Sequence, residues 1–237
     1  MESLELLYEG KSKKVYQTKD EDVILIHYKD DATAYNGIKK AEIKNKGICN
    51  NNISSYIFKY LKENGVDSHF ISQVNDCESL CKKLTIIPLE VICRNVCAGT
   101  MAKRLGIKEG TVLNNTVYEL CYKDDNLGDP LVNEHHAVAL GLVSYEELKV
   151  IYNITYKVNE LLKDLFNRVD ITLVDFKIEF GRDKNNNIIL ADEISPDSCR
   201  LWDKNTNDRL DKDRFRKDLG HVSDAYKEIY RRLGSLK

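Results

Sequence analysis

The beginning of the chain alternates between short apolar stretches and turn-forming residues. Apolar side chains concentrate in residues 4–8, 13–18 and 23–28, and Gly10 and the charged residues 19–22 separate these stretches. Short apolar runs bounded by such residues are typical of strands joined by hairpins. We therefore expect this part of the chain to form a small antiparallel sheet.

Helical periodicity becomes clear after these first strands. Apolar residues within 39–64 follow it and stop before Gly65, and glycine commonly ends a helix. The same spacing predicts helices over 144–167 and 213–233, and a short helix is expected over 99–106. The first of these helices is expected to pack on the N-terminal sheet.

Further strands follow the first helix. They are predicted within 70–97, over 117–122, and in a hairpin over 170–194. A mixture of strands and helices without an internal repeat predicts an α+β fold, here with two lobes. Residues 1–85 would form a mostly antiparallel β lobe, and residues 86–237 a mixed α and β lobe.

The composition limits the kinds of partner. The 237 residues are 42% hydrophobic and 31% charged, as in ordinary globular proteins. Lys and Arg number 36 against 38 Asp and Glu, and the net charge of −2 gives no overall positive field for nucleic acid or an anionic membrane. No apolar run approaches the roughly 20 residues of a membrane span, and no signal sequence precedes the lysines within 11–14. We expect a cytoplasmic protein that binds neither nucleic acid nor membranes.

The cysteines and histidines form no metal-binding pattern. Seven cysteines are present without a Cys-x-x-Cys pair, which disfavours a zinc site or a disulfide framework. The five histidines lack the spacing of metal ligands. Reduced, mostly buried thiols are therefore expected.

The predicted hairpin near the C-terminus carries the most informative polar residues. Alternation along residues 175–180 directs the even-numbered apolar side chains toward a core. The odd-numbered residues Asp175, Lys177 and Glu179 share the opposite face. This strand therefore presents a row of charged side chains.

A pair of carboxylates is predicted to meet across this hairpin. If residues 185–186 form a two-residue turn, Asp192 lies opposite Glu179. Facing carboxylates repel unless a cation lies between them, and oxygen-only ligands favour Mg²⁺, particularly beside nucleotide phosphates. We therefore predict a magnesium site, and the alternative is a solvated face on which Lys177 neutralises its neighbours.

The first hairpin contains Gly10-Lys11-Ser12, which resembles the end of a P-loop. The earlier glycine of that motif would fall at Glu5, and a strand rather than a helix is predicted to follow. A P-loop is therefore excluded. Lys11 and Lys13 still point to one face of a strand, where ammonium groups can hold nucleotide phosphates. A charged surface hairpin is the alternative.

A third group of polar residues lies near the predicted short helix. Glu90 and Arg94 share one face of an otherwise apolar strand, so they either pair with each other or serve a site. Arg94 and Thr100, beside the free N–H groups of a helix N-terminus, could form a phosphate cradle. Arg200 could join them, since its segment leaves the predicted metal-binding strand.

Seven blocks of sequence, in order along nearly the whole chain, resemble the SAICAR synthetase family. They include LYEGKSKKVY at 7–16 and DEISPDSCRLWD at 192–203, and the others lie at 30–37, 88–95, 102–106, 122–130 and 174–181. Several long blocks in one order are far more specific than a lone motif. The resemblance implies a two-lobed fold, distantly like that of protein kinases, with ATP in the cleft between the lobes.

The resemblance also implies the reaction. The carboxylate of carboxyaminoimidazole ribonucleotide (CAIR) would be joined to the amine of L-aspartate to give SAICAR in de novo purine (IMP) biosynthesis, while ATP becomes ADP and phosphate. A carboxylate is a poor acylating agent, so an acyl phosphate is the expected intermediate. A homodimer is a further expectation from the resemblance.

Functional residues are carried over position by position. The resemblance implies Mg²⁺ ligation by Glu179 and Asp192 and ATP contacts from Lys11, Lys13 and Lys123. It implies a CAIR site lined by Glu90, Arg94, Thr100, Asp197 and Arg200, with the phosphate on Arg94, Thr100 and Arg200. Thr100 stands where serine is expected, and it keeps the hydroxyl group.

The aspartate amine must be neutral to attack. Asp175 beside Lys177 is our candidate for positioning or accepting its proton.

Two other functions could use the same residues. A small-molecule kinase would phosphorylate a hydroxyl group, and a non-catalytic module would bind the nucleotide without turnover. Covalent attachment of aspartate distinguishes the ligase from both.

Overall fold

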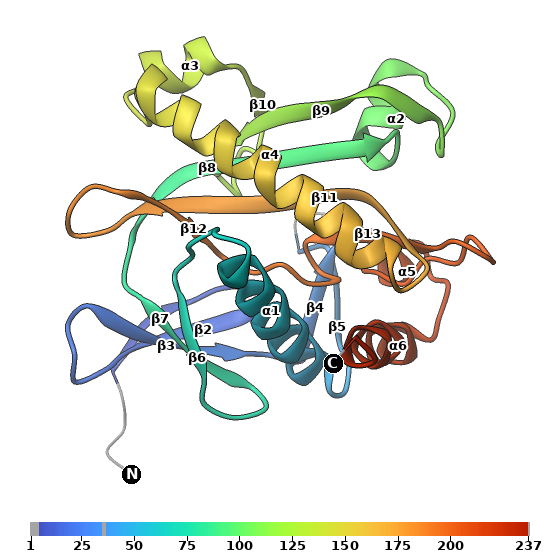
Figure 1. The fold of residues 1–237 in the computed structure, drawn as a ribbon, viewed down its shortest axis with the longest axis horizontal. Coiled ribbons are helices and arrows are strands. Elements are labelled where there is room, and N and C mark those ends of the chain that lie inside the picture. The colour runs from blue at the N-terminus through green and yellow to red at the C-terminus, as the bar shows by residue number, and fades with distance from the viewer. Residues whose placement is uncertain (1–4, 35–36, 237) are drawn as a thin grey trace.

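The N-terminal part of the chain forms a five-stranded antiparallel sheet. The computed structural model describes residues 5–34 and 37–236. The sheet has the order β1-β2-β3-β7-β6 (Figure 1). Its strands are β1 (Leu6–Glu9), β2 (Lys13–Gln17), β3 (Val23–Tyr28), β6 (Phe70–Gln73) and β7 (Glu78–Lys82). The predicted three-stranded meander is therefore confirmed.

A second sheet is built from the later strands. Its order is β10-β9-β8-β11-β12, and β13 pairs with β11, so that β8 and β11 are central. The strands are β8 (Thr85–Val96), β9 (Val112–Tyr122), β10 (Leu131–Val132), β11 (Ile171–Arg182), β12 (Ile188–Ala191) and β13 (Cys199–Asp203). A separate hairpin joins β4 (Asp31–Ala34) and β5 (Lys39–Glu42).

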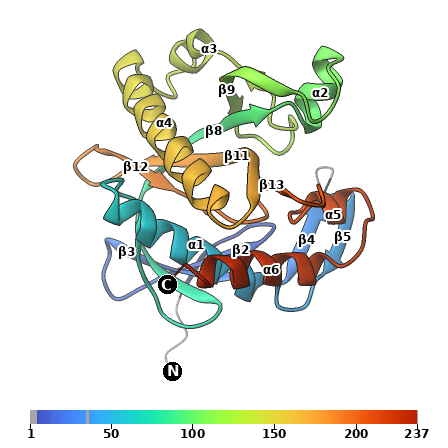
Figure 2. The same cartoon turned by 45° about the vertical axis from the view of Figure 1, so that its right-hand side comes forward.

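The long helices join the two sheets through one main core. It contains apolar side chains of α1 (Lys46–Glu63), α4 (Tyr145–Asn167) and α6 (Val222–Gly234), together with those of β8 and β11. α4 lies along the second sheet, and α1 and α6 lie side by side below it (Figures 1 and 2). The shorter helices are α2 (Gly99–Leu105), α3 (Glu134–Ala139) and α5 (Asp213–Arg216).

The expected α+β architecture is confirmed. The domain boundary at residue 85 stays a prediction.

Two helix predictions need correction. α1 begins at Lys46 rather than at residue 39, because residues 39–42 pair with β4 as strand β5. The last predicted helix is divided into α5 and α6, because Gly220 and His221 adopt left-handed backbone angles with φ of 69° and 52°. A left-handed residue interrupts helical hydrogen bonding.

The predicted register of the C-terminal hairpin is wrong by one residue. Glu179 pairs with Ala191 rather than with Asp192, because Arg182 pairs with Ile188 and the loop contains residues 183–187. Asp192 follows β12 at a φ of 63°, so the chain bends there. The Asp192 side chain therefore reaches the polar face from the bend and not from the strand.

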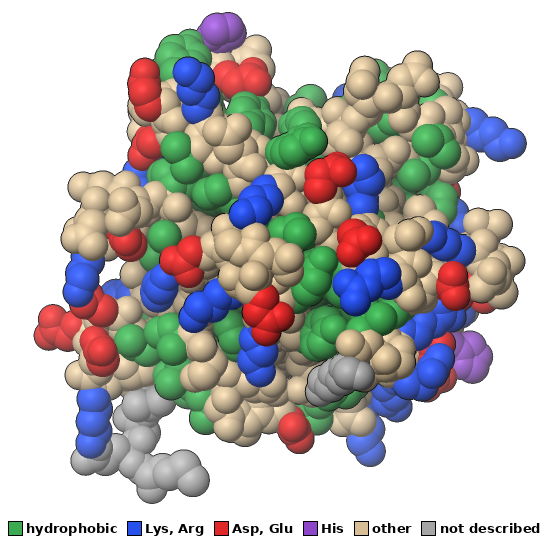
Figure 3. Space-filling view, viewed as in Figure 1, with side chains coloured by type: hydrophobic (Ala, Val, Ile, Leu, Met, Phe, Trp, Pro, Cys, Tyr) green, Lys and Arg blue, Asp and Glu red, His purple; other side chains and the backbone are tan. Residues whose placement is uncertain are grey.

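The composition predicts no overall positive field and reduced, mostly buried thiols. On the face in Figure 3, Lys and Arg side chains are intermixed with Asp and Glu. All seven cysteines are free thiols and six are buried, as predicted. No helix within residues 5–34 and 37–236 has the length and apolar character needed to cross a membrane.

Candidate active site

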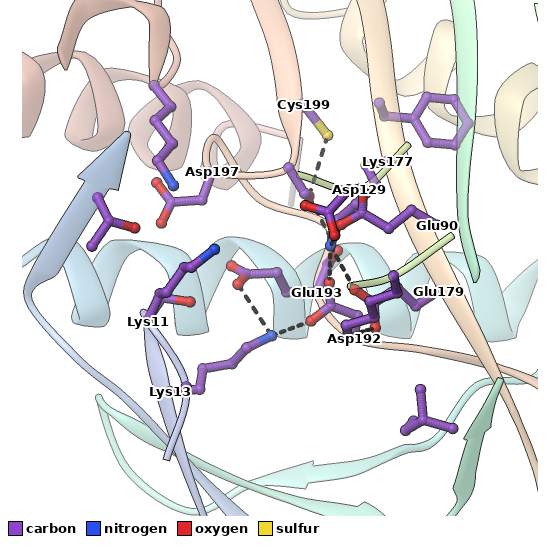
Figure 4. A pocket seen from close by; sticks show the side chains of 18 of the residues that line it. Lys11, Lys13, Glu90, Asp129, Lys177, Glu179, Asp192, Glu193, Asp197 and Cys199 are labelled. Carbon is purple, nitrogen blue, oxygen red and sulfur yellow. Dashed lines mark hydrogen bonds and ion pairs between the residues drawn. The ribbon is translucent and has the colours of Figure 1, made fainter. Parts of the chain in front are cut away.

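A single cavity of about 710 Å³ contains every residue predicted for the site. It lies between the lysine-bearing hairpin of the first sheet and the polar face of β11 (Figure 4). The predicted residues that line it are Lys11, Lys13, Glu90, Arg94, Thr100, Lys123, Asp175, Lys177, Glu179, Asp192, Asp197 and Arg200. Residues from both ends of the chain are thus brought into one site.

The part of the cavity next to the first sheet is apolar. It is lined by Val15, Ile24 and Ile26 of β2 and β3, and by Leu84 and Ile86 at the connection to the second sheet. Binding pockets commonly combine such apolar walls with a few polar groups that orient the ligand. This wall is suited to packing against the face of a flat ring such as a nucleotide base.

Glu179 and Asp192 converge on one cation at the centre of the cavity. The Lys177 Nζ lies 2.7 Å from Glu179 Oε1 and 2.8 Å from Asp192 Oδ2. Lys13 donates a hydrogen bond to Asp192, and Lys123 donates one to Glu179. Burial opposes ionisation of Asp192, but the ammonium groups of Lys13 and Lys177 outweigh it and hold the pKa of Asp192 well below its usual range. Both carboxylates are therefore oriented toward a shared positive charge.

This pair of carboxylates fits a magnesium ion. Both donors are hard oxygen atoms, and they are close enough to contact the same cation. In the described part of the chain, no group of three or more His, Cys, Asp and Glu side chains has the arrangement of a metal site. Mg²⁺ is commonly held by one or two carboxylates, with substrate phosphates and water as the other ligands.

Lys13 also pairs with Glu193, which the sequence pattern did not indicate as a site residue. A dashed line in Figure 4 joins the Lys13 Nζ to Glu193, whose Oε1 lies 3.1 Å away. Glu193 is buried. Alternation along a strand would direct Glu193 away from the face that carries Asp192. The bend at Asp192 removes that alternation, so both side chains reach the cavity.

Asp175 links the two arginines of the predicted phosphate cradle. Its carboxylate lies 2.7 Å from Arg94 Nη1 and 2.8 Å from Arg200 Nη1. Arg94 Nη2 donates a 3.3 Å hydrogen bond to Thr100 Oγ1 at the start of α2. The structure thus brings Arg94, Thr100 and Arg200 together. The alternative that Arg94 pairs with Glu90 is wrong, since Glu90 lies 3.4 Å from the Lys177 ammonium group.

Gly99 is required for this close approach. Its φ is 58°, and a Cβ atom at this position would lie 2.4 Å from Arg200 Nη2. A side chain at residue 99 would therefore both strain the backbone and displace the guanidinium group.

The Asp197 carboxylate is held by side chains of two helices. Its carboxylate accepts a 2.6 Å hydrogen bond from Lys46 Nζ of α1 and a 2.6 Å hydrogen bond from the Tyr226 hydroxyl group of α6. Burial opposes ionisation, but Lys46 outweighs it and lowers the pKa of Asp197. Neither Lys46 nor Tyr226 carried a signal in the sequence, because their partner is distant along the chain.

Comparison with known proteins identifies the family of this chain. A model of the SAICAR synthetase family matches residues 6–233. The phosphoribosylaminoimidazole-succinocarboxamide synthase of Fusobacterium nucleatum is 58% identical over 237 residues, which are 100% of both chains. That of Clostridium novyi is 60% identical over 232 residues, or 98% of each chain.

Solved structures give the same result. The synthase from Ehrlichia chaffeensis has a TM-score of 0.95 and 46% identity, covering 97% of this chain and 98% of that one. A SAICAR synthetase in complex with ADP has a TM-score of 0.93 and 50% identity, covering 95% and 96% of the two chains. The chain therefore belongs to the SAICAR synthetase family, the carbon–nitrogen ligases of purine biosynthesis.

Proposed function

We propose that this enzyme uses ATP to join the CAIR carboxylate to the amine of L-aspartate through an acyl phosphate. The observation that carries the proposal is one cavity with two distinct groups of cationic side chains. A lysine and carboxylate cluster adjoins an apolar wall, and an arginine pair faces the start of α2. The first region suits a nucleotide and its phosphates, and the second suits a phosphomonoester.

The nucleotide is assigned to the region beside the first sheet. Its base would lie on the apolar wall, and Lys11, Lys13 and Lys123 would contact the phosphates. Glu179 and Asp192 would hold magnesium. When bound, magnesium neutralises charge on the transferring phosphoryl group. A relative with 50% identity has been solved in complex with ADP, which supports the use of an adenine nucleotide.

CAIR is assigned to the arginine region. Arg94, Thr100 and Arg200 would bind its phosphate, which directs its carboxylate toward the nucleotide side of the same cavity. Glu90 and Asp197 would contact the rest of the molecule. Burial raises the pKa of Glu90, although Lys177 opposes this effect.

Asp175 and Lys177 remain the proposed catalytic pair. Both Asp175 oxygens accept hydrogen bonds from Arg200, and one also accepts from Arg94. These contacts favour a positioning role for Asp175 over acceptance of the amine proton. An Asp175→Asn enzyme with an unchanged pH profile of turnover would exclude the proton-accepting role.

Aspartate is assigned to the side of the cavity that Lys212 lines. The Lys212 ammonium group has no ion pair or hydrogen bond with the described residues. Burial lowers its pKa, although Asp197 opposes this effect. A carboxylate of the substrate would supply the missing partner. The loop 30–37 also borders this region, but Tyr35 and Asn36 lie outside the described residues.

Lys212→Met is expected to raise the KM for aspartate by about ten- to a hundredfold, because a charge-assisted contact is lost. The KM for ATP should stay unchanged. Initial rates measured with each substrate varied in turn test this assignment, and Lys227→Met, at an exposed position of α6, is the control. An unchanged KM for aspartate would move the aspartate site elsewhere.

The reaction itself is tested by substrate omission. ADP should form rapidly only when CAIR and aspartate are both present, and aspartate should become covalently attached to the product. A stable phosphorylated product formed without aspartate would indicate a kinase. Tight magnesium-ATP binding without turnover under any combination would indicate a binding module.

Family membership also supports two broader proposals. We propose that the enzyme acts in the cytoplasm and forms a homodimer. Sedimentation at several concentrations tests the second proposal, and a single species of 27.3 kDa throughout would contradict it.

A further inference from the structure

Seven charged side chains form one chain of ion pairs in which the sign of the charge alternates. The chain begins on α2, crosses the second sheet and ends on α5. Its members, in order, are Arg104, Glu119, Arg94, Asp175, Arg200, Asp213 and Arg216. We refer to these seven residues as the ion-pair chain.

The first half of the ion-pair chain holds Arg94. Arg94 Nε lies 2.7 Å from Glu119 Oε2, and Arg94 Nη1 lies 2.7 Å from Asp175 Oδ2. Glu119 also pairs with Arg104. Arg94, Glu119 and Asp175 are all buried, so water competes little for these contacts.

The second half holds Arg200 in the same manner. Arg200 Nη1 lies 2.8 Å from Asp175 Oδ2, and Arg200 Nε lies 3.0 Å from Asp213 Oδ2. The other Asp213 oxygen lies 2.7 Å from Arg216 Nη1, and Asp213 is buried. Each central arginine is thus bound on two sides by carboxylates.

These contacts leave one nitrogen of each guanidinium group directed at the start of α2. Arg94 Nη2 contacts Thr100 Oγ1 at 3.3 Å. Arg200 Nη2 lies 2.4 Å from the position that a Cβ atom of residue 99 would occupy. Both nitrogens therefore point to the region assigned to the CAIR phosphate before any ligand binds.

We propose that Glu119 and Asp213 are positioning residues for the phosphomonoester of CAIR. This inference rests on the proposed function. Neither carboxylate lines the cavity, and each adds negative charge near an anion site. Attraction for phosphate therefore does not explain their presence. Their presence is explained by orientation of the two central arginines, because a guanidinium group that is already held loses less conformational entropy when it binds phosphate.

Charge and orientation predict opposite results for Glu119→Gln. The substitution keeps the shape but removes one negative charge, so simple attraction would tighten phosphate binding. Loss of orientation weakens it. We expect the KM for CAIR to rise about tenfold or more, the KM for ATP to stay unchanged, and kcat to change by less than about threefold. Asp213→Asn at the other end should act in the same way.

A matched control is the Arg182–Glu147 ion pair, which lies outside the cavity. Its shortest contact is 2.6 Å, close to that of Arg94 with Glu119. Glu147→Gln should change thermal stability without changing the KM for CAIR. Binding of inorganic phosphate, measured by calorimetry and by competition against CAIR, should weaken in Glu119→Gln and not in Glu147→Gln.

An unchanged or lower KM for CAIR in Glu119→Gln would overturn the proposal. So would a lower active fraction with unchanged KM, since that result indicates a purely structural carboxylate. If Glu119→Gln does not fold, Asp213→Asn and the conservative Glu119→Asp decide by the same measurements. Failure of the ligase function itself would appear in the unsubstituted enzyme, as absence of aspartate attachment.

Discussion

Glu179→Gln combined with Asp192→Asn is expected to reduce magnesium-dependent turnover by about a thousandfold or more. Both carboxylates contact the Lys177 ammonium group in the cavity, so they lie close enough to share one metal ion. Loss of metal-assisted charge neutralisation costs several kcal/mol in the transition state, and each 1.36 kcal/mol is about tenfold in rate. Steady-state rates across a magnesium titration provide the measurement.

Nucleotide binding separates this effect from general damage to the site. The double substitution removes two negative charges beside Lys13, Lys123 and Lys177. Binding of ATP without magnesium should therefore be retained or tightened, while the additional affinity that magnesium supplies should disappear. These opposite changes would not result from local unfolding.

The control for this experiment carries the same chemical changes on the surface. Glu146→Gln with Asp164→Asn alters two exposed carboxylates of α4 that do not line the cavity. Normal magnesium dependence is expected. Retained turnover in the Glu179 and Asp192 variant would remove the metal assignment, although membership in the family would stand.

The face of the strand on which each side chain of this site lies could be predicted from the sequence. Strand periodicity is a property of neighbouring residues, so alternation correctly assigned Phe176 to the apolar core and Lys177 and Glu179 to the charged face of the strand. The register across the hairpin could not be predicted, because it depends on loop geometry. Asp183 accepts hydrogen bonds from the backbone of Asn185 and Asn187, which stabilises a five-residue loop.

Partners that are distant along the chain were not predictable. Alternation indicated that Arg94 would be costly to bury, but it gave no reason to select Glu119 as its partner. Lys46 and Asp197 are 151 residues apart, and a helical lysine is ordinarily assigned to the surface. Such contacts depend on how α1, α6 and the second sheet pack together, and this packing is set by the apolar residues of the core.

Lys46→Met is expected to reduce the free energy of unfolding by about 3–5 kcal/mol at neutral pH, because it leaves a buried carboxylate without its ion-pair partner. The Lys46 and Asp197 side chains are only 1% and 6% exposed, so water cannot replace the lost partner. The Tyr226 hydroxyl group would still donate one hydrogen bond to Asp197. Urea unfolding at pH 7 measures the loss.

The pH dependence of this loss follows from Asp197. In the unsubstituted enzyme Lys46 lowers the pKa of Asp197 below 3.8, so its ionised form contributes stability above that pH and loses it in stronger acid. Without Lys46, only Lys212 and the Tyr226 hydroxyl group still oppose the effect of burial, so the pKa of Asp197 rises. The folded variant then binds more protons than the folded unsubstituted enzyme as the pH falls. The stability difference between the two proteins should therefore shrink from pH 7 toward pH 4.

Two further variants make this test specific. Lys184→Met removes an exposed ion pair of 2.5 Å with Asp22, whose side chains are 69% and 57% exposed, and should leave the unfolding free energy unchanged. Lys46→Met with Asp197→Asn removes both buried charges and should recover much of the stability that Lys46→Met loses. A loss that stays constant between pH 7 and pH 4, or that the double substitution does not reduce, would show that packing around Lys46 and not the charge of Asp197 determines the effect.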